Sequence, residues 1–67
     1  MTEEQQNILA KFGCDTYEDL AAEHLALLHD IARADTNDPH LRWLYGYADY
    51  MNENIYKYEK ASVAANN

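Results

Sequence analysis

The chain is 67 residues long, and its 12 acidic side chains outnumber its 5 lysines and arginines, which gives a formal net charge of −7. This length allows one domain, and a 48% share of apolar and aromatic residues is typical of a folded chain rather than a disordered one. The few scattered basic residues argue against direct binding of nucleic acid or of anionic membranes, because clustered lysine and arginine bind such surfaces.

The first predicted helix is short and has clear signals at both ends. Thr2 is a favourable N-cap, and Gln5 stands at the third helical position, where it completes a capping box. Gly13 is a natural C-terminal stop, since glycine adopts the left-handed conformation at little cost. The small apolar face of this helix consists of Ile8, Leu9 and Phe12.

The second predicted helix starts at Asp15 or Thr16 and ends near Ala34. Two capping boxes compete at its start, one from Asp15 to Glu18 and the other from Thr16 to Asp19. The sequence therefore places the N-cap only to within one residue. Apolar residues and one histidine recur at steps of three and four, which places them on one face. That face comprises Tyr17, Leu20, His24, Leu27, Leu28 and Ile31.

The third predicted helix begins at Pro39 with Asp38 as its N-cap, because proline at the first helical position loses no hydrogen bond. It runs to about Lys60, and we expect residues 61–67 to fray. Along it, residues at alternating steps of three and four form a heptad-like apolar seam. The seam comprises Leu41, Leu44, Ala48, Met51, Ile55 and Tyr58.

These elements predict an all-α fold, a small three-helix domain that spans residues 1–67. The turn between the second and third helices is short, so we expect these two helices to form an antiparallel hairpin. Cys14 is the only cysteine, which excludes an intrachain disulfide, and a core this small is marginally stable alone. We therefore expect the domain to associate with a second copy or with another protein.

Two groups of side chains are candidates for contacts with a partner. The surplus negative charge lies on the outward faces of the second and third helices. This acidic face comprises Asp19, Glu23, Asp30, Asp49 and Glu53. The second group is an aromatic stripe, Trp43, Tyr47 and Tyr50, whose spacing places it beside the apolar seam. Either the first two helices cover both sides of the third helix, or this stripe contacts another chain, since tyrosine and tryptophan are enriched in interfaces.

No pattern in the sequence indicates catalysis, a metal or a cofactor. His24 and His29 are five residues apart and point in different directions on a helix, so we interpret His24 as a core residue. Cys14 precedes a helix, where a thiol can be reactive, but no second cysteine accompanies it and a small buried side chain is expected. Asp19 and Glu23 share a face, yet acid–base chemistry needs a cleft for which three helices offer little room.

One binding motif is excluded by charge. Residues 12–27 have the spacing of a helix-turn-helix, but Asp19, Glu23 and Asp30 would give its recognition helix a negative charge, which a DNA groove repels.

No apolar run approaches the roughly 20 residues that span a bilayer, and the first residues do not resemble an export signal, so we expect a cytoplasmic protein.

The favoured hypothesis is a small acidic protein–protein interaction module with no enzymatic activity. It would be an inhibitor or regulator that occupies a basic, nucleic-acid-binding surface of a partner protein. Anti-CRISPR proteins of phage and other nucleic-acid mimics offer an analogy of size and charge, not of sequence. The alternative is a homo-oligomeric adaptor or regulatory subunit, such as a dimer, that uses the aromatic stripe of the third helix.

Overall fold

Three α-helices make up the protein in the computed structural model, which describes residues 1–65, with side chains described through Val63. The helices are α1 (Glu3–Lys11), α2 (Tyr17–Arg33) and α3 (Leu41–Ala65), and the described residues contain no strand. The predicted all-α fold is therefore confirmed. Within the same residues, none of the helices combines the length and the apolar character needed to cross a bilayer.

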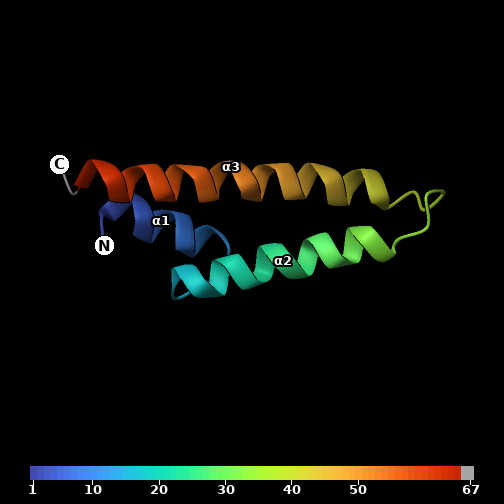
Figure 1. Cartoon of the computed structure of the whole chain (residues 1–67), viewed down its shortest axis with the longest axis horizontal. Coiled ribbons are helices and arrows are strands. Elements are labelled where there is room, and N and C mark those ends of the chain that lie inside the picture. Colours follow the sequence, from blue (N-terminus) through green and yellow to red (C-terminus); the bar gives the residue numbers. More distant parts are fainter. Residues whose placement is uncertain (66–67) are drawn as a thin grey trace.

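The long helix α3 extends along the whole molecule, and the other two helices lie against it (Figure 1). α1 lies beside the C-terminal part of α3, whereas α2 lies beside its N-terminal part, and both run antiparallel to it. α2 and α3 pack more closely than any other pair of helices, which confirms the predicted antiparallel hairpin. The result is an elongated molecule of 46 × 18 × 15 Å.

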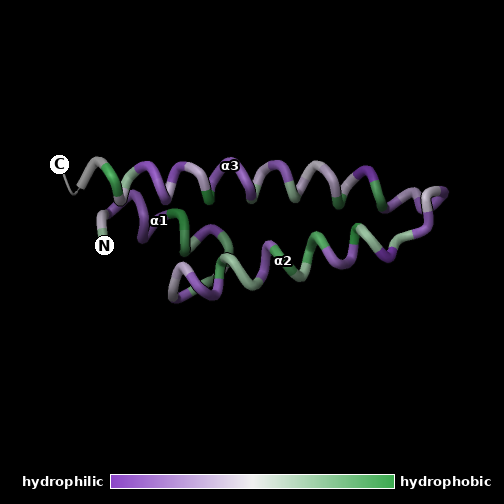
Figure 2. The backbone as a smooth tube through the Cα atoms, in the orientation of Figure 1, coloured by the Kyte–Doolittle hydropathy of each residue, from purple (hydrophilic) through white to green (hydrophobic). Residues whose placement is uncertain are grey.

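The core lies where the three helices meet. Each helix contributes two of its six buried apolar residues, and Leu20 of α2 is 0% exposed. Figure 2 shows hydrophobic stretches of α3 recurring on the side that faces α1 and α2. Burial of one leucine contributes roughly 1.5–3 kcal/mol, so these few residues dominate the stability of the fold. The buried apolar residues are Ile8, Leu9, Leu20, Leu27, Ala48 and Met51.

The ends of α1 form as the sequence predicts. Thr2 Oγ1 accepts a hydrogen bond from the Gln5 amide at 3.1 Å, and Gln5 Oε1 accepts one from the Thr2 amide at 2.8 Å. This reciprocal pair is the predicted capping box. At the other end, Gly13 has a φ of 66°, a left-handed conformation that other residues rarely adopt, and it turns the chain back toward α2.

The structure resolves the two competing starts of α2 in favour of Thr16. Its Oγ1 accepts a hydrogen bond from the Asp19 amide at 3.2 Å. Tyr17 in the first turn stacks on Tyr58 of α3 with ring centroids 4.9 Å apart, and its hydroxyl donates to a carboxylate oxygen of Glu59. These contacts attach the start of α2 to the C-terminal half of α3. The helix ends at Arg33 with Ala34 as its C-cap, close to the predicted end.

Both predicted ends of α3 need correction. The helix begins at Leu41 instead of Pro39, because the Leu41 amide donates to the Asp38 carbonyl oxygen and closes a tighter, three-residue turn first. The predicted N-cap is also corrected, because the Oδ1 of Asp38 accepts from the His40 amide at 2.9 Å, within the turn that precedes the helix, and not from an amide of the helix itself. At the other end, the helix continues to Ala65, beyond the predicted end near Lys60. Residues 66–67 lie outside the described residues.

One residue of the predicted face of α2 lies outside the core. Leu28 is 43% exposed, although Leu20 and Leu27 are buried and Ile31 is half-buried. Leu28 follows Leu27 by about 100° around the helix. Because α2 packs mainly on a single helix, that rotation carries Leu28 to the edge of the contact. Leu25 lies still further round and is 55% exposed, so α2 leaves an apolar edge uncovered.

Polar side chains fix the position of α1 on α3. Gln5, 5% exposed, donates through Nε2 to the carbonyl oxygen of Tyr58 at 3.2 Å. Asn54, 2% exposed, donates to the Tyr50 carbonyl oxygen at 2.9 Å and accepts from Lys11 Nζ at 3.4 Å. Buried polar groups need such partners. The bonds from Gln5 to Tyr58 and from Lys11 to Asn54 can form only when α1 lies at one position along α3. These contacts therefore set how far α1 extends along α3.

Candidate functional site

Two members of the aromatic stripe, Trp43 and Tyr47, form a continuous stack with His40 at the N-terminal end of α3. The rings of His40 and Trp43 lie 5.4 Å apart with an interplanar angle of 22°, and those of Trp43 and Tyr47 lie 5.3 Å apart at 14°. Residues three and four positions apart are neighbours on a helix, which is why these rings meet. Trp43 is 58% exposed, so one side of the stack is open to solvent.

Phe12, at the end of α1, covers the other end of the stripe. Its ring lies 5.6 Å from that of Tyr50 and 6.3 Å from that of Tyr47, the second contact being edge-on. Tyr47 is half-buried between these neighbours, whereas Tyr50 remains 46% exposed. α1 thus covers part of the stripe, and Trp43 is its most exposed member.

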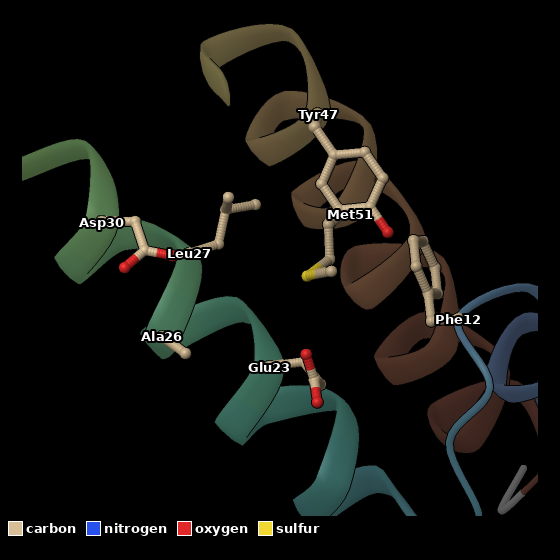
Figure 3. Close-up of a pocket in the computed structure, with 7 residues that line it drawn as sticks. All are labelled: Phe12, Glu23, Ala26, Leu27, Asp30, Tyr47 and Met51. Carbon is tan, nitrogen blue, oxygen red and sulfur yellow. The ribbon is translucent and has the colours of Figure 1, made fainter. Parts of the chain in front are cut away.

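A groove separates this stripe from α2. Its volume is about 150 Å³, and its lining residues come from α2, from α3 and from the end of α1 (Figure 3). Leu27 and Met51 form its apolar floor, and the acidic side chains come from α2. The residues that line it are Phe12, Glu23, Ala26, Leu27, Asp30, Tyr47 and Met51.

The five residues of the predicted acidic face do not form one surface. Glu23 and Asp30 line the groove beside Tyr47, but Asp49 and Glu53 do not. Asp49 follows Tyr47 by two residues, or about 200° around α3, which turns it away from the groove. All five are exposed, and Asp19 lies one turn before Glu23 on α2. The acids of α2 and those of α3 are therefore separate groups.

Two ion pairs occur among the described side chains. Arg33 approaches Asp30 at 3.4 Å, and Lys57 approaches Glu53 at 3.9 Å. Both pairs are exposed, and such pairs contribute roughly 0–1 kcal/mol because water screens them. Glu23 takes part in neither pair, so it is the carboxylate of the groove that no nearby base compensates among the described residues.

Cys14, two residues after Phe12, packs against the core and has the properties of a packing residue. Burial raises the pKa of its thiol above the ordinary value of 9.0, and the negative charges of Glu23, Asp19 and Asp15 raise this pKa further. Its Sγ lies 3.6 Å from the Phe12 carbonyl oxygen, to which the thiol donates. A neutral thiol packed against the core agrees with the interpretation of Cys14 as a small apolar side chain.

The histidines do not come together. His24 is half-buried on the core-facing side of α2, as its spacing predicts, while His29 and His40 are exposed. Among the described residues, no three side chains of the types that bind metals gather at one point.

Three features of the structure were not predicted from the sequence. Phe12 was expected only in the face of the first helix, but it closes the end of the groove. Asn54 follows Met51 by three residues, so its spacing could have marked it as a buried polar residue. The uncovered edge at Leu25 had no signal, because that residue lies outside the predicted face.

Comparisons with family models, with curated proteins and with solved structures find no match for this chain.

Proposed function

We propose that this protein binds a basic surface of another protein, using the groove between α2 and α3 and the aromatic stripe beside it. The basic surface is one that otherwise binds nucleic acid, so the protein acts as an inhibitor or regulator of the anti-CRISPR or nucleic-acid-mimic type. The proposal includes no catalytic step, and it takes the cytoplasm as the location where the partner is met.

One observation carries the proposal. Two carboxylates, Glu23 and Asp30, line the same groove as the half-buried ring of Tyr47. Interfaces combine large aromatic contacts with complementary charge, and the rings supply most of the affinity. The exposed ring of Trp43 extends this surface beyond the groove. With a net charge of −7, the whole chain favours approach of a positively charged partner.

A second candidate function is self-association through the same stripe. The observation that favours it is the exposure of large apolar side chains on α3, where Trp43 is 58% and Tyr50 46% exposed. Exposed apolar patches on small proteins often mark interfaces. A homodimer of this kind would bring the acidic groups of two copies together. Because those groups repel each other, binding of a basic partner is the favoured function of the two.

The two candidates differ in their response to salt. Light scattering of the purified chain, at low salt and at about 0.5 M salt, reports whether it is a monomer or a dimer. A dimer held by aromatic contacts keeps its mass at high salt. A monomer that captures a nucleic-acid-binding protein at low salt, and releases it at high salt, behaves as the proposal requires.

Charge-reversed variants make this test specific for the groove. The double variant Glu23→Lys/Asp30→Lys should lose the captured protein and no longer block its binding to nucleic acid. Its matched control is Asp49→Lys/Glu53→Lys, which changes the net charge equally and also breaks one exposed ion pair. Equal loss with both double variants, or a captured protein that still binds nucleic acid, would contradict the proposal.

A further inference from the structure

We propose that the groove between α2 and α3 receives the guanidinium group of one arginine side chain of the partner. This inference rests on the proposed function, because it assumes that the partner is a protein with a basic surface. It adds a defined site and a defined chemical group, and it predicts discrimination between arginine and lysine.

The size of the groove suits one side-chain head group. Its volume is about 150 Å³, which is comparable to protein cavities that hold one benzene molecule. A guanidinium group with its adjoining methylene groups has a similar planar shape and size. Figure 3 shows the groove bounded by α2 on one side and by α3 and Phe12 on the other, so an inserted chain would lie between Glu23 and the rings.

The aromatic side of the groove suits a cation. The rings of Phe12 and Tyr47 line it, and Trp43 stacks on one face of Tyr47. A cation within roughly 6 Å of a ring centroid is attracted by the negative face of the ring. The floor of Leu27 and Met51 excludes water from below, which strengthens this attraction.

The opposite side of the groove supplies negative charge. Glu23 and Asp30 lie beside the core residue Leu27 on α2, four residues before it and three after it, and no basic residue is among the described residues that line the groove. Arg33 partly neutralises Asp30 through their 3.4 Å contact. Glu23 therefore carries most of the charge that an incoming cation meets.

The combination of rings and carboxylates favours arginine over lysine. A guanidinium group is planar, stacks on aromatic rings and donates several hydrogen bonds in its plane to carboxylates at the same time. The ammonium group of lysine is a compact and strongly hydrated charge, and it loses more hydration on entering a partly apolar groove.

The test uses the full chain and three short peptides that need no natural partner. Each peptide is acetylated and amidated and has glycines around one central residue, which is arginine, lysine or citrulline. Citrulline has nearly the shape of arginine but no charge. In ¹⁵N-resolved NMR titrations at millimolar concentration, the arginine peptide should shift the signals of Glu23, Ala26 and Met51. The lysine and citrulline peptides should bind several-fold more weakly.

Two matched variants locate the binding. Glu23→Gln should weaken binding of the arginine peptide by about threefold to tenfold, whereas Glu53→Gln, with the same change of net charge, should leave it unchanged. Tyr47→Leu should weaken it as well, and amide signals that keep their dispersion would show that this variant remains folded. Equal binding of the three peptides, equal effects of Glu23→Gln and Glu53→Gln, or shifts outside the groove would overturn the proposal.

This result can be separated from the fate of the proposed function. If a basic partner is captured through Glu23 and Asp30 while the arginine and citrulline peptides bind alike, only the arginine site is wrong. If the arginine peptide binds in the groove but no nucleic-acid-binding protein displaces it from there, the arginine site is correct and the proposed function is wrong.

Discussion

Phe12 meets Tyr47 edge-on, with ring centroids 6.3 Å apart and ring planes at 86°. The first residue follows α1 and the second belongs to α3, so this contact joins the end of the shortest helix to the aromatic stripe. Edge-on pairs of this kind are favourable because the positive ring edge faces the negative ring surface. The contact also closes one end of the groove, which makes α1 a support for the proposed site.

Phe12→Ala should therefore affect both stability and the stripe. We expect the free energy of unfolding to fall by about 2 kcal/mol, less than for a fully buried phenylalanine because Phe12 is only half-buried. Urea denaturation measures this change, and near-ultraviolet circular dichroism should show looser packing of Tyr47 and Tyr50. Phe12→Leu is the control and should retain most of the stability. An unchanged denaturation midpoint in the alanine variant would show that α1 does not support the stripe.

Trp43→Ala should abolish association of the chain with its partner, or with a second copy, while leaving the isolated chain folded. Trp43 is 58% exposed and stacks mainly on Tyr47 and His40, so its removal leaves the core intact. Far-ultraviolet circular dichroism should change little, and light scattering should detect no complex. Tyr56→Ala removes a ring that is 62% exposed elsewhere on α3 and should bind normally. If Trp43→Ala unfolds the isolated chain, or if the tryptophan emission stays fixed when partner is added, the stripe is not the interface.

Asp38→Ala should destabilise the start of α3. The Asp38 carboxylate accepts a hydrogen bond from the His40 amide at 2.9 Å in the turn before the helix, and loss of one such bond lowers stability by roughly 0.5–1.5 kcal/mol. Asp38→Asn is the control and should retain most of the stability, since its side-chain oxygen can also accept the hydrogen bond. Thermal denaturation distinguishes the two variants. A melting temperature for Asp38→Ala equal to that of the parent chain would mean that the bond from His40 to Asp38 does not contribute to stability.

The hydrogen bond from Tyr17 to Glu59 predicts a specific loss of stability in alkali. This bond raises the pKa of the Tyr17 hydroxyl above 10.0, and burial and the charge of Glu59 add to the effect. Because the pKa is raised in the folded state, the contribution is fully present below pH 10.0 and is lost as pH rises through the raised value.

The measurement compares the parent chain with Tyr17→Phe from neutral to strongly alkaline pH. At neutral pH the variant should be less stable, because it lacks the hydrogen bond. The difference between the two free energies of unfolding should shrink above pH 10.0, and the titration of the other tyrosines cancels in this difference. A difference that stays constant across the range would show that Tyr17 does not bond Glu59 in solution.

Association kinetics should depend on Glu23 and Asp30 at low salt only. Exposed charges mainly steer the first encounter, and salt screens that steering. Glu23→Lys/Asp30→Lys should slow association with a basic partner at low salt and hardly change it at high salt, as surface plasmon resonance can measure. Asp49→Lys/Glu53→Lys should slow it less, because those acids lie away from the groove. Parent and variant rates that agree at both salt levels would remove the support for charge steering.

The sequence predicted helix ends where the signal is local. The capping box of Thr2 and Gln5 and the stop at Gly13 each depend on residues within one turn, and both form. The start of α2 was ambiguous because Asp15 and Thr16 are both good caps. The end of α3 was missed, since Ala61 and its neighbours favour helix strongly enough to continue it to Ala65.

The site was only partly predictable because it depends on how α2 and α3 are rotated toward each other. Periodicity correctly placed Trp43, Tyr47 and Tyr50 on one side of α3. It could not show that Glu23 faces Tyr47 while Asp49 turns away, since that relation is set by packing around Leu20 and Met51. For the same reason, spacing alone did not reveal that Leu28 lies outside the contact.

The elongated shape has a consequence for experiments on the size of this protein in solution. Its radius of gyration is 13.6 Å, compared with about 11 Å for a compact domain of this length. A rod diffuses more slowly than a sphere of equal mass, so the monomer should elute early from a gel-filtration column. Elution volume alone would therefore report a dimer where none exists, and only a method that measures mass independently of friction can count the copies.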